Sequence, residues 1–161
     1  MNQTLINDFN EILTGRRSIR NYDPSFKISR QEMTEILTKA TLAPSSLNLQ
    51  PWRFVVIDSP EGKATLAPLA KFNQRQVETS SAMIAVFADM NSLDYADDIY
   101  QQSVEKGYMP AEVRDTQLPA IKGLISALEP EQLKDMNLID AGLVSMQLML
   151  AARAQDRKSV V

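Results

Sequence analysis

Three arginines and a serine lie within five residues, in the segment Arg16-Arg17-Ser18-Ile19-Arg20. Guanidinium groups present hydrogen-bond donors in a fixed fork, and each charge-assisted hydrogen bond to an anion contributes roughly 1.5 to 3 kcal/mol. The segment can therefore surround a phosphate group. The alternative interpretation is a basic turn after a helix, where the helix dipole favours positive charge.

A second polar segment, residues 43–52, contains two prolines at Pro44 and Pro51. Because proline restricts its own backbone and that of the preceding residue, we expect Pro44 to end an incoming helix and Pro51 to hold Gln50 extended. Hydroxyl and amide groups between the prolines suit a neutral polar ligand such as the pyrimidine ring of a flavin. The alternative is a solvated loop of turn-forming residues.

Together the two segments resemble the nitroreductase family of FMN-dependent oxidoreductases. The resemblance continues through Trp52-Arg53-Phe54-Val55-Val56 and Phe72-Asn73-Gln74-Arg75, and it covers about residues 5–154. It implies an α+β fold in which helices flank a central sheet and a long buried helix lies near a dimer interface. We expect residues 1–161 to form a single nitroreductase-like domain.

The resemblance also implies a flavin site shared by the two subunits of a homodimer. Arg16, Arg17 and Ser18 would hold the ribityl phosphate, and Arg20 would reach the polar edge of the flavin or the ribityl chain. Asn73 would bond the pyrimidine side, and the polar loop would come from the other subunit. The implied cofactor-binding residues are Arg16, Arg17, Ser18, Arg20, Pro44, Ser45, Ser46, Asn48 and Asn73.

The reaction that the resemblance implies passes hydride from NAD(P)H through FMN to a nitroaromatic or quinone-like small molecule, in a ping-pong sequence. The chain contains no cysteine and no histidine. This composition excludes thiolate nucleophiles, zinc sites of the usual type and histidine bases, and it leaves redox chemistry to a bound cofactor. We therefore predict no side-chain acid or base and no metal site.

The chain departs from the family after Ala154. Family members continue with a further strand, a Pro-x-x-Gly-Phe-like turn at the flavin, another strand and a segment carrying a basic phosphate ligand, whereas this chain ends with Gln155–Val161. We expect an incomplete sheet and FMN binding weakened by roughly tenfold to a thousandfold, with Arg157 or Lys158 as a replacement cation. Two alternatives stay open: a catalytically impaired dimer with weak or no FMN binding, and an unrelated α+β module that binds another phosphorylated ligand.

Composition limits the other functions. The chain has 161 residues, 44% of them hydrophobic, and a net charge of −3, and its basic residues are scattered outside the arginine segment. Nucleic-acid binding would require a broad basic face, so we predict none. The first residues lack the basic and apolar regions of a signal peptide, and no apolar run reaches eighteen residues. We expect no membrane association and a cytoplasmic location.

Apolar periodicity predicts the first elements. We expect helices over residues 5–15 and 30–42, the second opened by a capping box of Ser29 and Glu32. Residues 52–58 predict a buried strand, and Ser59-Pro60-Glu61 predicts a short helix after it. Asn73 is expected to cap the next helix.

The second half of the chain predicts one strand followed by helices. Residues 82–88 are expected to form a central strand covered on both faces. Over residues 89–129 the pattern is helical but broken by Gly107, Pro110 and Pro119, and the resemblance implies a variable helical excursion there. The longest helix is expected to begin at Pro130 and to carry apolar residues on nearly all sides, so we expect it to be buried. Gly142 would allow another helix to approach closely.

Overall fold

The computed structural model describes residues 5–160 as a mainly helical chain with one two-stranded antiparallel sheet, which confirms the α+β class. Two compact units form. The first unit contains the chain up to Ala43, Phe54–Val86 and the chain from Val144, and the second contains Pro44–Arg53 and Phe87–Leu143. Each unit is therefore assembled from segments that are distant in the sequence.

Two capped helices belong to the N-terminal part of the first unit. Helix α1 (Phe9–Gly15) begins later than predicted, because the Asp8 carboxylate accepts a hydrogen bond from the Glu11 N–H at 2.7 Å and so caps the helix there. Helix α2 (Arg30–Ala40) is capped by Ser29 as predicted. The Glu32 carboxylate forms an ion pair with Arg157, so only the serine half of the capping box is present.

The sheet consists of β1 (Trp52–Ile57) and β2 (Met83–Ala88). Both strands lie where the sequence predicts them, but the expectation of full burial is wrong. Val55 is 49% exposed and Phe87 is 56% exposed. Since the sheet has two strands within the described residues, each strand has one neighbour and neither is central.

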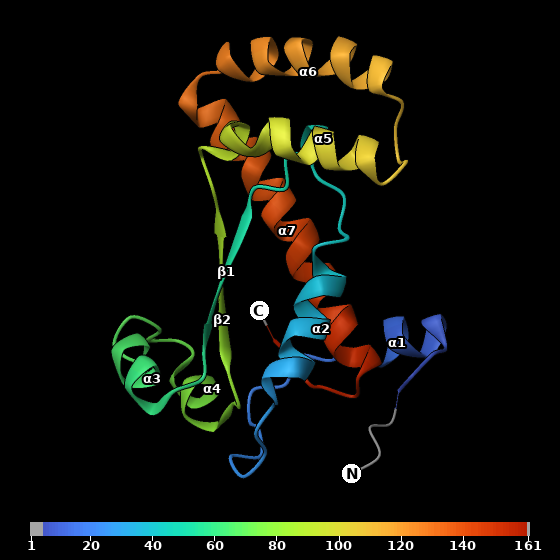
Figure 1. The fold of residues 1–161 in the computed structure, drawn as a ribbon. Helices are drawn as coiled ribbons and strands as arrows, with labels where there is room; N and C mark the ends of the chain where they lie inside the picture. The colour runs from blue at the N-terminus through green and yellow to red at the C-terminus, as the bar shows by residue number, and fades with distance from the viewer. Residues whose placement is uncertain (1–4, 161) are drawn as a thin grey trace. The chain divides into compact units, whose positions relative to one another are not determined.

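Two short helices lie next to each other between the strands in sequence, α3 (Pro60–Leu66) and α4 (Gln74–Thr79) (Figure 1). The Ser59 hydroxyl accepts a hydrogen bond from the Gly62 N–H at 3.0 Å, and Pro60 occupies the first helical position. This confirms the predicted helix start, because a hydroxyl satisfies a free N–H and proline needs no donor there.

The second unit is built around helices α5 (Ala96–Glu105) and α6 (Ala111–Ser126), which pack side by side (Figure 1). A short 3₁₀ helix, η2 (Ser92–Tyr95), precedes α5. Pro119 lies inside α6, so the predicted break there is wrong. Pro119 and Asp115 are both exposed, and water can satisfy the carbonyl that the missing N–H leaves free. The core of the unit contains Leu49, Ala96, Tyr100, Ile121 and Ile125.

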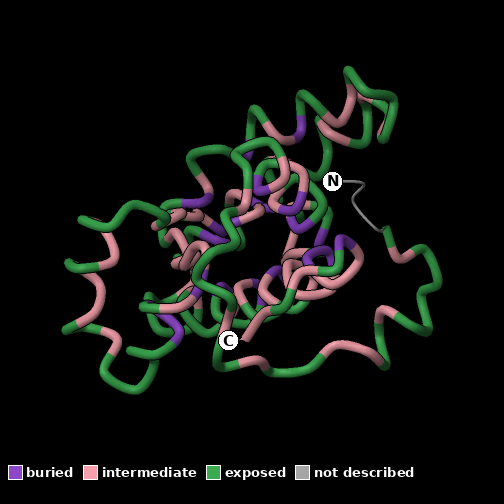
Figure 2. Tube along the Cα trace, turned by 90° about the horizontal axis from the view of Figure 1, so that it is seen from below, coloured by how far each residue is buried: buried purple, intermediate pink, exposed green. Residues whose placement is uncertain are grey.

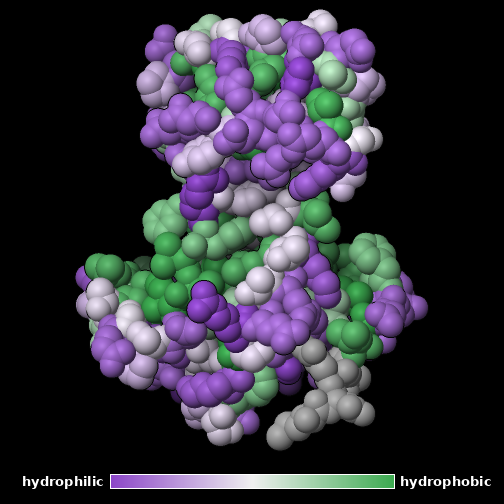
Figure 3. Space-filling view, in the orientation of Figure 1, coloured by the Kyte–Doolittle hydropathy of each residue, from purple (hydrophilic) through white to green (hydrophobic). Residues whose placement is uncertain are grey.

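Helix α7 (Pro130–Ala154) is the longest element, as predicted, but it is only partly buried. Leu138, Ile139 and Leu143 are 55%, 66% and 42% exposed. A side chain placed on Gly142 would meet nothing within 4 Å, so no helix among residues 5–160 approaches closely there. Buried positions form short stretches between exposed ones along the chain (Figure 2), and hydrophobic areas remain on the surface (Figure 3). The prediction of a fully buried helix is wrong for the single chain.

Candidate functional site

The arginine segment follows α1 directly, in the first unit. One Nη of Arg17 donates hydrogen bonds to the carbonyl oxygens of Thr14 and Arg16, at 2.6 and 2.8 Å, and so caps the helix end. Arg16 is half-buried and Arg20 is exposed, and the structure gives neither side chain a hydrogen bond or ion pair to residues 5–160. Their guanidinium donors are therefore available to an external anion.

The end of the chain pairs with this segment. Ser18 and Ser159 form an isolated parallel β-bridge, and the Ile19 N–H donates to the Ser159 carbonyl at 3.3 Å. Arg157 does not supply a free cation, because it pairs with Glu32 and stacks over the Phe26 ring at 4.4 Å. Lys158 precedes the bridge directly and has no ion pair within residues 5–160. Of the two suggested replacement cations, Lys158 is the one left uncommitted.

Asn73 lies immediately before α4, at the N-cap position. The prediction that its side chain caps the helix is wrong, because it forms no capping hydrogen bond. Its Oδ1 instead accepts a hydrogen bond from Gln76 Nε2 at 3.1 Å, which leaves the Asn73 amino group as a donor. Helix α4 is tied to the residues after Arg20: Arg75 Nε donates to Asn21 Oδ1 at 2.9 Å, and the Tyr22 N–H donates to Thr79 Oγ1 at 3.2 Å.

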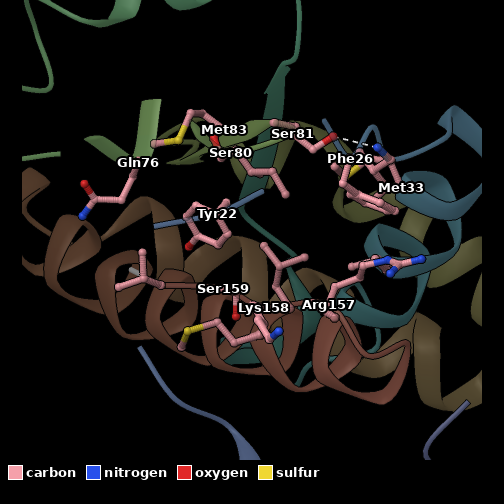
Figure 4. A pocket seen from close by; sticks show the side chains of 18 of the residues that line it. Tyr22, Phe26, Met33, Gln76, Ser80, Ser81, Met83, Arg157, Lys158 and Ser159 are labelled. Carbon is pink, nitrogen blue, oxygen red and sulfur yellow. Dashed lines mark hydrogen bonds between the residues drawn. The ribbon is translucent and has the colours of Figure 1, made fainter. Parts of the chain in front are cut away.

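A cavity of about 800 Å³ lies within the first unit. Figure 4 shows Tyr22 in the middle of it, with Met83 and Ser80 on one side and Lys158 and Ser159 on the other. Burial raises the pKa of Tyr22 above its ordinary value of 10.0. Asn73 also lines this cavity.

Sequence reasoning missed Gln76, the buried partner of Asn73. Gln76 is 6% exposed and lines the same cavity as Asn73. The available signal was the spacing: a side chain three residues after Asn73 lies on the same side of a helix one turn later. Gln76 therefore lies beside Asn73, one of the predicted site residues, in the wall of the same cavity.

The polar loop, residues 44–50, belongs to the second unit and has an unusual backbone. Leu47, Asn48 and Gln50 have positive φ values of 53°, 53° and 47°. The prediction of an extended Gln50 is wrong. Its N–H donates to Ser45 Oγ at 3.0 Å and its carbonyl accepts from Arg53 Nη1 at 3.2 Å, and these bonds hold the left-handed conformation.

Buried groups anchor this loop, so the alternative of a solvated loop does not describe it. Asp140 of α7 is 1% exposed and accepts hydrogen bonds from the Ser46 N–H, at 3.0 Å to each carboxylate oxygen, and from Ser46 Oγ at 3.1 Å. The Tyr100 hydroxyl donates to the Leu47 carbonyl at 3.1 Å. Leu49 lies in the core at 1% exposure.

One salt bridge, a cation–π contact and two hydrogen bonds support the residues that follow the loop. Arg53 pairs with Asp89 at 2.9 Å and lies over the Tyr95 ring at 4.4 Å. The Asp89 N–H donates to the Pro51 carbonyl at 2.7 Å, and Asn137, which is 1% exposed, donates to the Asp89 carbonyl at 3.1 Å. The loop and the start of β1 are thus fixed by one network within the second unit.

The structure places the predicted residues in two groups. Arg16, Arg17, Ser18, Arg20 and Asn73 lie in the first unit, and Pro44, Ser45, Ser46 and Asn48 lie in the second. Their assembly around one flavin across a homodimer stays a prediction. Among residues 5–160 no cluster of acidic residues could hold a metal ion. In the same part of the chain, no helix combines the length and apolar composition that a membrane crossing requires.

Comparison with known proteins gives consistent matches over most of the chain. The model of the family described as Nitroreductase family matches residues 13–161. A Bacillus subtilis protein named "Putative NAD(P)H nitroreductase YdgI" is 66% identical over 148 residues, which are 92% of this chain and 71% of that protein. The "CLA biosynthesis enone reductase" of Lactiplantibacillus plantarum is 38% identical over 92% of this chain and 69% of its own length.

Solved structures agree with these matches. A crystal structure from Exiguobacterium sibiricum, described as a putative nitroreductase in complex with FMN, superposes with a TM-score of 0.91 at 66% identity. The superposition covers 95% of this chain and 73% of that one. The comparisons by structure and by sequence therefore match the same family.

Proposed function

This chain belongs to the nitroreductase family, and on that premise we propose that it is an oxidoreductase that binds FMN and takes its electrons from NAD(P)H. The observation that carries the proposal is the pair of uncommitted guanidinium groups on Arg16 and Arg20, next to Ser18. The names of its relatives support it, since one at 66% identity is named for NAD(P)H and another was crystallised with FMN.

The residues present fit this cofactor. A phosphate would be held by Arg16, Arg20 and Ser18, because their donors face no acceptor within residues 5–160. The Asn73 amino group, fixed by Gln76, would donate to a carbonyl oxygen of the flavin ring. The polar loop would supply hydroxyl and amide groups to the flavin of the other subunit.

FMN, when bound, supplies hydride transfer between NAD(P)H and an acceptor. The chain's own groups bind and orient it, and the absence of histidine and cysteine from the sequence means that neither residue type serves as acid, base or nucleophile. We propose a nitroaromatic or quinone-like acceptor and a ping-pong sequence. Because one relative is named an enone reductase, conjugated enones belong among the acceptors to be assayed.

We further propose that the protein acts as a homodimer. The exposed apolar side chains of Leu138, Ile139 and Leu143 on α7 support this, because such side chains on a long helix are typical of a surface that another chain covers. The cytoplasmic location stays a prediction from the sequence.

A flavin-loading experiment tests the proposed function. The purified protein is incubated with excess FMN and desalted, and its visible absorbance spectrum gives the bound flavin per chain. We expect close to one flavin per chain and FMN-dependent oxidation of NADH or NADPH when an acceptor is added. A protein that remains colourless after loading at high FMN concentration would overturn the proposal.

A further inference from the structure

Asp140 is a buried carboxylate that the family resemblance does not assign to any task. It lies on α7, 94 residues after Ser46 in the sequence, and it accepts hydrogen bonds from the N–H and the hydroxyl of Ser46. Its exposure is 1%. A carboxylate at such a position has lost its water and depends on these donors, so the Ser46 backbone is held where the carboxylate lies.

Tyr100 holds the next residue of the same loop from another helix. Its side chain is buried at 4% exposure, and its hydroxyl donates to the Leu47 carbonyl at 3.1 Å. Leu47 and Asn48 follow with φ near 53°. Left-handed conformations cost energy for residues other than glycine and persist where surrounding contacts enforce them. Two buried polar groups thus hold the strained part of the loop.

The carboxylate also determines how Ser46 can bond a ligand. An ionised carboxylate only accepts hydrogen bonds, so the Ser46 hydroxyl must donate its proton to Asp140. The free lone pairs of Ser46 Oγ can then only accept. Ser45 has the opposite arrangement, because its Oγ accepts the Gln50 N–H and its own proton remains free to donate.

We propose that Asp140 and Tyr100 are positioning residues that fix the polar loop for FMN binding, and that Asp140 makes Ser46 an acceptor beside the donor Ser45. This inference rests on the proposed function. A flavin presents carbonyl oxygens, ribityl hydroxyls and one ring N–H, so a loop with adjacent donor and acceptor matches its polar groups. Neither positioning residue touches the cofactor in this proposal.

The test compares Asp140→Asn with Asp135→Asn in the full chain. Asp135 lies on the same helix and is exposed, so its variant makes the same change of charge without touching the loop. Two quantities are measured: amide hydrogen exchange at Ser46 in the FMN-free protein, by NMR, and the dissociation constant for FMN, by quenching of flavin fluorescence. We expect Asp140→Asn to speed exchange at Ser46 at least tenfold, while amides of α7 keep their protection, and to weaken FMN binding at least tenfold. Asp135→Asn should change both within twofold.

Tyr100→Phe provides a second variant, which removes one hydroxyl and keeps the packing of the ring. We expect it to weaken FMN binding severalfold. When Asp140→Asn and Tyr100→Phe are combined, the fold-loss of FMN affinity should be smaller than the product of the two single fold-losses, because both residues act through the same loop. This outcome separates positioning of the loop from a general loss of stability, which would give independent effects.

The possible outcomes are distinct. If the wild-type protein binds no FMN, the proposed function fails, and Ser46 exchange alone decides whether Asp140 holds the loop. If the wild-type protein binds FMN but Asp140→Asn leaves Ser46 exchange and FMN affinity within twofold, the inference is wrong and the proposed function stands. If Asp140→Asn does not fold, Tyr100→Phe decides: unchanged FMN affinity in that variant overturns the inference.

Discussion

The arginines of this chain differ in whether their guanidinium groups are already bonded within the fold, a difference that the sequence does not show. Arg17 is engaged by backbone carbonyls, and Arg53 and Arg157 are engaged by carboxylates and aromatic rings. Arg16 and Arg20 have no such partner within residues 5–160. A guanidinium that the fold does not use can bind a ligand without first breaking an internal bond. The resemblance assigned Arg17 to the phosphate, whereas its observed bonds give it a second task in ending α1.

Arg16→Gln and Arg20→Gln should each weaken FMN binding by roughly tenfold to a hundredfold. Each change removes a charge-assisted contact worth roughly 1.5 to 3 kcal/mol. Titration of FMN fluorescence measures the effect. Arg30→Gln is the control, since Arg30 is exposed on α2 and is not part of the arginine segment, so this variant should leave FMN affinity within twofold. Equal affinities in all three variants would contradict the phosphate assignment.

The buried Tyr100 and the half-buried Tyr22 should make the stability of the protein sensitive to alkali. Burial raises the pKa of Tyr100 and of Tyr22 above the ordinary value of 10.0. A raised pKa means that the folded state holds the phenol proton more tightly than the unfolded state does. The stability that this contributes is complete below pH 10.0 and is lost as the pH rises through the folded-state pKa. Urea unfolding between pH 8 and 11 should show stability falling above about pH 10. Tyr100→Phe should make this fall shallower, and an unchanged slope would contradict the assignment.

At the scale of elements, local signals predicted the starts of α2, α3 and both strands, but they missed the start of α1 and predicted the burial of elements poorly. The Ser29 and Ser59 caps and both strands were predictable, because capping and β-branched runs are local. The left-handed Gln50 was not predictable, because the hydrogen bond that its N–H donates to Ser45 and the one that its carbonyl accepts from Arg53 override the restriction that Pro51 imposes. The burial of α7 was not predictable either, since the sequence pattern of an apolar helix is the same whether its own chain or another chain covers it. In the candidate site, the sequence shows the residue types and the spacing of Gln76 from Asn73, but it does not show that Asp140, 94 residues away, is the partner of Ser46.

Two glycines of the second unit should respond oppositely to alanine. Gly107 follows α5 with φ of 72°, a conformation that costs alanine about 1 to 2 kcal/mol. Gly123 lies inside α6, and a Cβ there would meet nothing within 4 Å. Gly107→Ala should lower the free energy of unfolding by about 1 kcal/mol, and Gly123→Ala should raise it by up to about 1 kcal/mol. Urea titrations measure both, and a shift of the same sign in the two variants would contradict the assigned backbone conformations.

At the scale of the whole molecule, the single chain leaves apolar side chains uncovered. Leu138, Ile139 and Leu143 follow one another along α7, in a stretch whose buried positions include Asn137 and Asp140. Burial of such side chains on association contributes roughly 25 cal/mol per Å² of apolar surface. The inward positions of this stretch are polar and the outward ones apolar, which favours association with another chain.

Ile139→Lys should therefore shift the protein from dimer to monomer in sedimentation velocity. A charged side chain at a position that is 66% exposed is tolerated in the monomer but not in a buried interface. Leu124→Lys is the matched control, because Leu124 is 55% exposed on α6. A dimer that survives Ile139→Lys at the wild-type concentration range would exclude this part of α7 from the interface.

The assembly of each unit from distant segments has a consequence for synthesis of the protein on the ribosome. The polar loop is translated 94 residues before Asp140, and Glu32 is translated 125 residues before Arg157. At roughly 5 to 20 residues per second, the nascent loop waits roughly 5 to 20 seconds for the carboxylate that holds it. Neither unit can therefore fold as an N-terminal block during translation. Each unit can be completed only after its own part of α7 has left the ribosome.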